Sequence, residues 1–131
     1  MITVIMKRDI NNRQDIEMLI NSFYEVVKQD PVIGHFFSDV VKVNWEKHLP
    51  VMYDFWENIL FYSGSYTGNP MAVHKHLHSL HPLTKENFDQ WLRIFKSTAR
   101  NLFEGDNTEL IIQRAQSIAM VMELKIVRGE R

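Results

Sequence analysis

The chain of 131 residues contains no cysteine and has only four prolines and five glycines. Without cysteine it can form no disulfide framework, no thiolate nucleophile and no cysteine-ligated zinc or iron–sulfur site. No stretch approaches the run of about eighteen apolar residues that marks a membrane-spanning helix. The apolar start, residues 1–6, is too short for the core of a signal peptide. The sequence therefore predicts a cytoplasmic protein with no membrane partner.

An excess of charge of either sign is also lacking, because 15 lysines and arginines face 16 aspartates and glutamates. Nucleic-acid binding depends on a basic surface, so we expect no nucleic-acid partner. The length fits one domain, and no linker or repeat divides the chain, which predicts a single domain over residues 1–131. The near-neutral charge and the lack of an obvious exposed apolar stripe favour a monomer or a weak dimer.

Apolar residues recur every three or four positions in most of the chain, which is the spacing of a helix with one buried face. This spacing predicts long helices over residues 12–28, 49–60, 88–102 and 110–126. The β-branched run at 40–43 is isolated, and no hairpin signal accompanies it. We therefore expect an all-α protein with four main helices.

Polar residues at the helix starts suggest where each helix begins. Asn12 is the expected N-cap of the first helix. Asp106, three residues before Glu109, has the spacing of a capping box at the last helix. Asn69 and Pro70 have the types expected for the cap and first position of a further short helix, which would carry His74.

Pro50 conflicts with a simple start of the second long helix. A proline deep in a helix removes a backbone donor and collides with the preceding turn. We therefore expect residues 44–48 to form either a separate turn or a bent entry, with His48 near the start of the second long helix.

Histidine is frequent, and four of the six histidines lie at positions 74, 76, 78 and 81. His74 and His78 are four residues apart and could share a helix face as metal ligands. No carboxylate or cysteine stands beside them at ligand spacing, so the alternative is a solvated, histidine-rich turn. His74 differs from the others because Met71 and Leu77 place it on an inward-facing stripe.

Three further polar or aromatic residues lie on apolar stripes. His48 shares its stripe with Met52 and Trp56, Tyr24 follows Phe23 at the edge of the first stripe, and Trp91 is central in the third. Taken alone, each is interpreted as a core residue, with its polar atom needing a partner if it is buried. From the residues alone, the alternative function is a small helical binding module with an aromatic interior.

The pattern as a whole resembles the truncated haemoglobins, most closely their third group. Matching stretches follow one another in order from about residue 15 to residue 122: 21–24 (NSFY), 33–37 (IGHFF), 44–50 (NWEKHLP), 54–56 (DFW), 66–74 (YTGNPMAVH), 88–95 (FDQWLRIF) and 113–119 (QRAQSIA). Each motif is weak singly, but seven in order make the resemblance strong.

The resemblance implies a two-over-two helical sandwich around one haem b, with the globin core at about residues 12–127. His74 matches the proximal histidine that binds the iron, and Phe37 matches the phenylalanine that packs on the haem face. The remaining implied pocket residues are the distal Tyr24, His48 and Trp91, and Met52, Phe55 and Trp56 on the same helix as His48.

The resemblance further implies pentacoordinate iron that binds O₂, NO and CO in a polar distal pocket. Among the distal residues we expect Tyr24 to be the leading hydrogen-bond donor and Trp91 the second, whereas the helix entry at Pro50 would let His48 swing between pocket and solvent as a gate. Oxygen transport, nitric oxide dioxygenase and peroxidase-like activities stay open, and turnover would need an external reductase. The alternative from another class is a haem-free helical protein, either a histidine-rich metal binder or an interaction module.

Overall fold

The computed structural model describes residues 6–129, and no strand occurs in this part of the chain. The helices are α1 (Arg13–Val27), η1 (Phe36–Val40), α2 (Trp45–Phe61), α3 (Pro70–Leu80), α4 (Lys85–Leu102), α5 (Asp106–Met122) and η2 (Glu123–Val127). The prediction of an all-α protein is confirmed. Residues 1–5, which hold most of the apolar start, lie outside the described residues. No described helix combines the length and apolarity needed to span a membrane.

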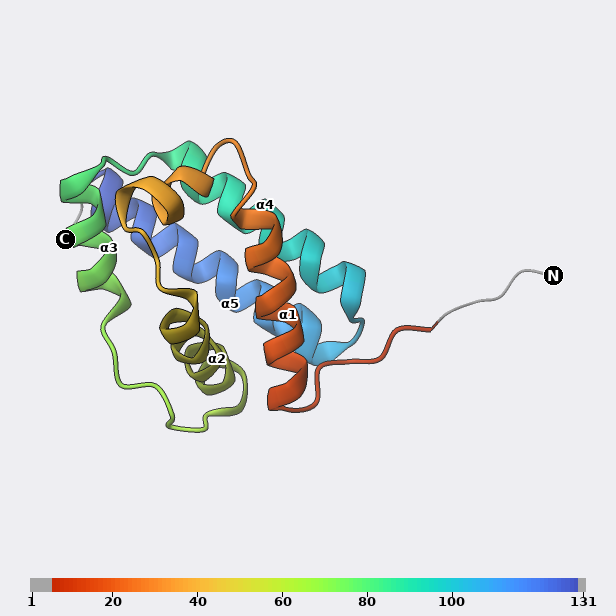
Figure 1. Ribbon diagram of the computed structural model, residues 1–131. Coiled ribbons are helices and arrows are strands. Elements are labelled where there is room, and N and C mark those ends of the chain that lie inside the picture. Colours follow the sequence, from red (N-terminus) through yellow and green to blue (C-terminus); the bar gives the residue numbers. More distant parts are fainter. Residues whose placement is uncertain (1–5, 130–131) are drawn as a thin grey trace.

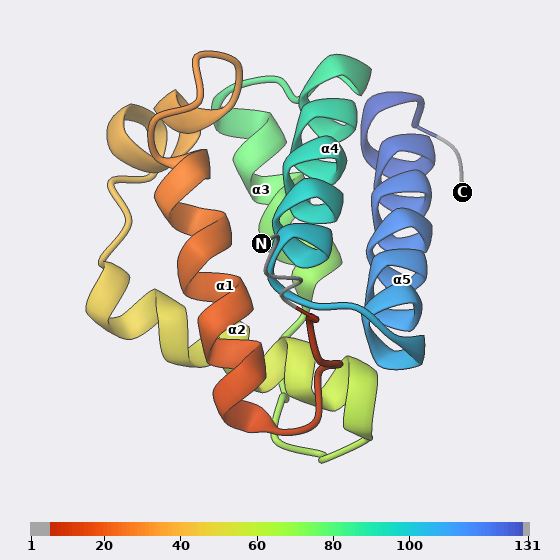
Figure 2. The ribbon, with the colours of Figure 1, turned by 90° about the vertical axis from the view of Figure 1, so that its right-hand side faces the viewer.

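The four long helices pack as two pairs. α1 contacts α2, α4 contacts α5, and the pairs meet where α1 packs on α4 and α2 on α5. Helices α4 and α5 run side by side in both views (Figures 1 and 2). The shorter α3 lies at the side of the molecule away from α1 and contacts η2 near the C-terminus (Figure 1). This is the expected two-over-two arrangement.

The hydrophobic core is densest between α1, α4 and α5. Phe23 of α1 and Phe95 of α4 are 1% and 0% exposed, and their rings meet edge to face with centroids 5.4 Å apart. Such a pair adds to the free energy gained from burying the rings. By contrast, no residue of α3 is fully buried. The core therefore fixes the positions of α1, α4 and α5, while α3 covers a less filled region.

Most of the expected helix starts are confirmed. The Asn12 side chain accepts a hydrogen bond from the backbone N–H of Asp15 (3.0 Å). Asn69 caps α3 by accepting from the N–H of Ala72 (3.1 Å), and Pro70 occupies the first helical position. These caps satisfy backbone donors that the first turn of a helix cannot pair internally.

The predicted capping box at Asp106 is wrong. The N-cap of α5 is Gly105, and it makes no side-chain cap hydrogen bond. The Asp9 carboxylate performs this role from outside the helix: it accepts from the backbone N–H of Asn107 (2.9 Å) and Thr108 (2.8 Å), and from the Thr108 hydroxyl (2.7 Å). Gly105 has φ 147°, and a Cβ there would collide with the Asp9 side chain, so both backbone freedom and close approach favour glycine.

For residues 44–48 the sequence predicted either a separate turn or a bent entry into the second long helix, and the separate turn is wrong. Residues 44–48 do not form a separate turn, because α2 runs unbroken from Trp45 with Asn44 as its N-cap and Pro50 inside it. Pro50 lies in the second turn, where it leaves the carbonyl of Glu46 without its usual helical donor. His48 accordingly lies in the first turn of α2, as expected.

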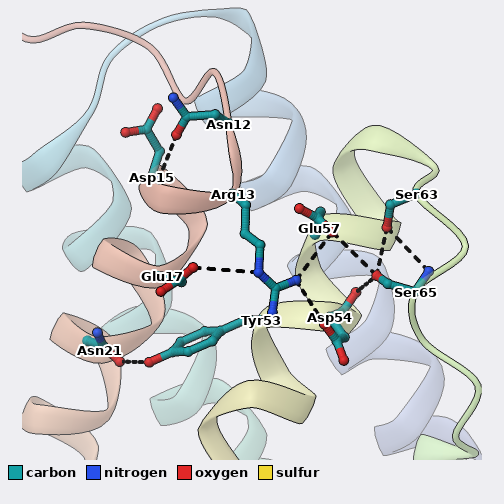
Figure 3. Close-up of polar contacts among 10 residues, drawn as sticks. All are labelled: Asn12, Arg13, Asp15, Glu17, Asn21, Tyr53, Asp54, Glu57, Ser63 and Ser65. Carbon is teal, nitrogen blue, oxygen red and sulfur yellow. Dashed lines mark hydrogen bonds and ion pairs between the residues drawn. The ribbon is translucent and has the colours of Figure 1, made fainter.

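A polar network ties α1 to α2 and to the loop that follows (Figure 3). The Arg13 guanidinium donates to Asp54 (2.8 Å) and Glu57 (3.3 Å) of α2. Ser65 Oγ donates to the backbone carbonyl of Asp54 (3.2 Å) and lies 3.4 Å from a Glu57 carboxylate oxygen. One arginine near the start of α1 thus helps to place the loop that leads to α3.

We expect Asp9→Ala to lower the free energy of unfolding by about 1–2 kcal/mol, the usual cost of losing a helix N-cap. The loss arises because two backbone donors of α5 and the buried Thr108 hydroxyl would lose their acceptor. Asp106→Ala is the matched control and should change stability by less than about 0.5 kcal/mol. Urea unfolding of the two variants measures the difference, and an equal loss in both would contradict the assignment of Asp9.

The contribution of Asp9 should also depend on pH. Burial alone would raise the pKa of the Asp9 carboxyl, but hydrogen bonds from Asn107, Thr108 and Ile10 outweigh burial and the pKa is lowered. A lowered pKa means that the stability is present above the unfolded-state pKa of 3.8 and is lost as pH falls through the folded-state value. The difference in the free energy of unfolding between the native chain and Asp9→Asn should therefore shrink as the pH falls, which urea unfolding at several pH values measures.

Candidate functional site

A cavity of about 530 Å³ lies among α1, η1, α2, α3, α4 and α5. Its wall is mostly apolar, and one patch of it comes from α5 through Ile118, Ala119 and Met122. The volume is in the range of sites that bind small molecules and cofactors. A few polar side chains interrupt the wall, which is the usual composition of a site that orients its ligand.

The cavity brings together side chains that are up to 98 positions apart in the chain, from Tyr24 to Met122. Its wall contains all of the pocket residues expected from the sequence: Tyr24, Phe37, His48, Met52, Phe55, Trp56, His74 and Trp91. The roles assigned to these residues stay predictions, but their shared location is the arrangement that those roles require.

His74 is a half-buried residue of α3 that lies against the cavity. Its Nδ1 lies 2.7 Å from the backbone carbonyl of Pro70, one turn earlier. A carbonyl can only accept, so Nδ1 is a protonated nitrogen, and whenever the imidazole is neutral Nε2 keeps its lone pair. A backbone carbonyl that fixes the ring in this way is typical of metal-binding histidines.

Tyr24 is 7% exposed, and its phenol has no hydrogen-bond partner among residues 6–129. Burial raises the pKa of Tyr24, so the hydroxyl stays protonated at neutral pH. The ring is held edge to face against Phe23 (centroids 5.0 Å apart) and Phe37 (5.7 Å). Tyr24 therefore offers the cavity a fixed hydroxyl donor.

His48 Nε2 is buried and has no hydrogen-bond partner in the described part of the chain. Burial lowers the pKa of the His48 imidazole, and the nearby His74 lowers it further. The two histidines face the same cavity although they come from different helices, α2 and α3. Because buried polar atoms are normally paired, this nitrogen marks a place for a polar ligand atom.

Trp91 adds a further polar group to the wall. Its indole N–H makes no hydrogen bond within residues 6–129, and an indole nitrogen can only donate. The ring is stacked against Trp56 (centroids 6.3 Å apart, planes at 23°) and Phe95 (5.6 Å, 20°). These flat contacts fix the ring plane and continue the aromatic wall from α2 to α4.

The remaining clustered histidines do not join His74 in a metal site. His78 Nδ1 accepts from the backbone N–H of Leu83 (2.8 Å), which shapes the turn between α3 and α4. His81 packs against His35 (ring centroids 5.1 Å apart), and His76 is exposed at the cavity. Within residues 6–129 no group of three or more potential ligands could hold a metal ion, so this part of the chain does not support His74 and His78 as ligands of a shared metal site.

Several cavity residues were not singled out from the sequence. Tyr66 lines the cavity and meets Phe55 edge to face (5.1 Å), and Gly68 leaves the space beside its hydroxyl. The only sequence signal was its position in the matched stretch at 66–74. Ile118 and Ala119 were expected on a buried stripe of the last helix, but periodicity alone cannot separate a stripe facing the core from one facing a ligand.

The residues fit the haem that the sequence resemblance implies. A macrocycle of this kind needs an apolar slot, a histidine with a free and oriented nitrogen, and few competing polar groups. The cavity provides aromatic and aliphatic walls, the Nε2 of His74, and His48 Nε2 as a buried polar atom that none of the described residues pairs. Among residues 6–129 no carboxylate lines the cavity.

Comparisons with known proteins match the whole arrangement. A family model described as bacterial-like globin matches residues 9–124. The chain is 32% identical over 117 residues to the group 3 truncated hemoglobin ctb of Campylobacter jejuni, covering 87% of this chain and 90% of that protein. The crystal structure of a group III truncated hemoglobin from Campylobacter jejuni matches with a TM-score of 0.80 at 29% identity, covering 92% of this chain and 95% of that one.

The buried imidazole at position 48 should make the haem-free chain sensitive to acid. Its pKa is lowered by burial and by His74, so the unfolded chain binds a proton more readily than the folded chain. Stability is therefore lost as pH falls through the unfolded value of 6.5 toward the folded value. We expect His48→Gln to lose less stability than the native chain over this range. Urea unfolding at several pH values tests this, and equal losses would contradict it.

Proposed function

The chain belongs to the bacterial-like globin family and is a haem-binding protein of the globin type, and we propose that it holds haem b in the cavity with His74 on the iron. The observation that carries this proposal is the placement of one oriented imidazole, on α3, in the same cavity as three polar groups from α1, α2 and α4. The three polar groups are the Tyr24 hydroxyl, the His48 imidazole and the Trp91 indole N–H. A backbone carbonyl orients the ring of His74, whereas His48 has no such partner among the described residues. This difference favours His74 as the one protein ligand on the iron.

When bound, the haem iron supplies a coordination position that takes O₂, NO or CO. The protein then has to orient the proximal imidazole, exclude water and donate hydrogen bonds. The Pro70 carbonyl orients His74, and the aromatic wall formed by Phe37, Phe55 and Trp56 excludes water. Tyr24 is the leading donor to a diatomic ligand with partial negative charge, because burial keeps its hydroxyl protonated.

Titration of the chain with haemin, followed by absorption spectroscopy, tests the proposal. We expect saturation at one haem per chain and a strong Soret band that shifts when CO is added to the reduced protein. A colourless chain that refuses haemin would instead support the haem-free alternative of an interaction module.

We expect His74→Gly to lose the proximal bond and to weaken haem retention. Added imidazole should restore the ferrous spectrum, because a free imidazole can occupy the space of the missing ring. His76→Gln is the matched control, since it removes another histidine of α3 that lines the cavity and should leave the ferrous spectrum unchanged. If His76→Gln lost the spectrum and His74→Gly kept it, the ligand assignment would be wrong.

Tyr24→Phe should speed O₂ dissociation about tenfold. A hydrogen bond contributes a net free energy of about 1–1.5 kcal/mol, and about 1.4 kcal/mol corresponds to a factor of ten. Stopped-flow displacement of O₂ by CO measures the rate. An unchanged rate in a correctly folded, haem-loaded variant would remove Tyr24 from the mechanism.

A second candidate is turnover of nitric oxide, in which NO, O₂ and one electron give nitrate. The polar distal residues favour it, since donors that hold a diatomic ligand also limit its premature loss. The electron would come from an external reductase. Steady-state consumption of NO with a reducing system, compared with simple O₂ equilibrium binding, separates an enzyme from a reversible carrier.

A further inference from the structure

His48 is held in the cavity wall by aromatic rings and not by hydrogen bonds. Neither of its ring nitrogens has a hydrogen-bond partner among residues 6–129. Its ring meets two others edge to face: Tyr24, with centroids 5.5 Å apart, and Trp45, with centroids 5.6 Å apart. Packing of these two rings therefore determines whether the imidazole stays in the wall.

Trp45 supports the cavity wall from behind. It does not line the cavity, but it stacks on Phe37 (centroids 5.7 Å apart, planes at 24°) and lies 5.1 Å from Tyr24. Trp45 thus contacts three residues of the wall at once, each from a different element: Phe37 of η1, Tyr24 of α1 and His48 of α2.

A cation covers Trp45. The Lys28 ammonium, at the C-terminal end of α1, lies 4.5 Å from the centroid of its ring. The same ammonium pairs with Glu25 at 3.1 Å, which keeps it near the indole. A cation over a tryptophan face is attracted by the negative face of the ring. Lys28 therefore fastens the start of α2 to the end of α1.

We propose that Trp45, covered by Lys28, is a positioning residue that keeps His48 in the cavity wall and so sets how often the distal side opens to solvent. The inference rests on the proposed function only in taking the cavity as the haem site. Trp45 lies three residues before His48, so the two side chains are neighbours on one helix face.

The local backbone makes this side-chain contact important. Pro50 has no N–H, so the carbonyl of Glu46 lacks its helical donor just beyond the first turn of α2. The first turn of α2, which carries His48, is consequently held by fewer backbone hydrogen bonds than an ordinary first turn. Its position depends more strongly on the contacts of Trp45 with α1 and η1.

Chemical modification of His48 in the haem-loaded protein tests the proposal. Diethylpyrocarbonate reacts with exposed imidazoles, and peptide mass spectrometry reports each histidine separately, with the exposed His81 as internal reference. Trp45→Leu should raise the relative rate at His48 by about tenfold, which corresponds to about 1.4 kcal/mol, the upper range for an aromatic contact. Trp45→Phe should restore most of the protection, and Lys28→Gln should give an intermediate rate.

Tyr53→Phe is the matched control. Tyr53 is also an aromatic residue of α2, but it hydrogen-bonds to Asn21 and does not line the cavity. This variant should leave the rate at His48 unchanged, because its ring remains and only the hydroxyl is lost.

The C–O stretching band of the reduced, CO-bound protein provides a second measurement, since it reports the polar groups near the ligand. Trp45→Leu should change the distribution of C–O bands in the direction given by His48→Leu, and Tyr53→Phe should not. Failure of the native chain to bind haem would refute the proposed function. If all variants bind haem normally and Trp45→Leu leaves both the modification rate and the C–O bands unchanged, the role of Trp45 is wrong.

Discussion

Three polar atoms that find no partner within the described protein face one apolar cavity, and this is the constraint from which the account follows. The Tyr24 hydroxyl, His48 Nε2 and the Trp91 indole N–H lie on different helices, yet all belong to the same wall. Of these three atoms His48 Nε2 is fully buried, and protein interiors rarely leave such an atom unpaired, because the loss of hydration is costly. Their convergence in one cavity with an oriented histidine is explained by a ligand that brings its own polar atoms.

The rest of the fold serves to hold these groups at fixed positions. The Phe23–Phe95 contact joins α1 to α4, so that Tyr24 and Trp91 are attached to one rigid core. The Arg13 network links α1 to α2 and to the loop before α3. Helix α3 in turn carries His74. Buried core residues are thus concentrated on α1, α4 and α5, whereas α3, which also lines the cavity, has no buried residue.

Local sequence signals predicted the helices well and the long-range contacts poorly. Asn12 and Asn69 cap their helices as expected, because a cap depends only on the next three residues. The capping of α5 by Asp9 could not be predicted, since nearly a hundred residues separate donor and acceptor and nothing in the local pattern links them. The resemblance placed the cavity residues by motif, but the aromatic support from Trp45 required the packed structure.

The most direct measurement of the central claim is the resonance Raman spectrum of the reduced, ligand-free, haem-loaded protein. If His74 is the single protein ligand, the spectrum contains an iron–imidazole stretching band of five-coordinate haem, which disappears in His74→Gly and persists in His48→Leu. A six-coordinate spectrum without that band, or a band that persists in His74→Gly, would contradict the account.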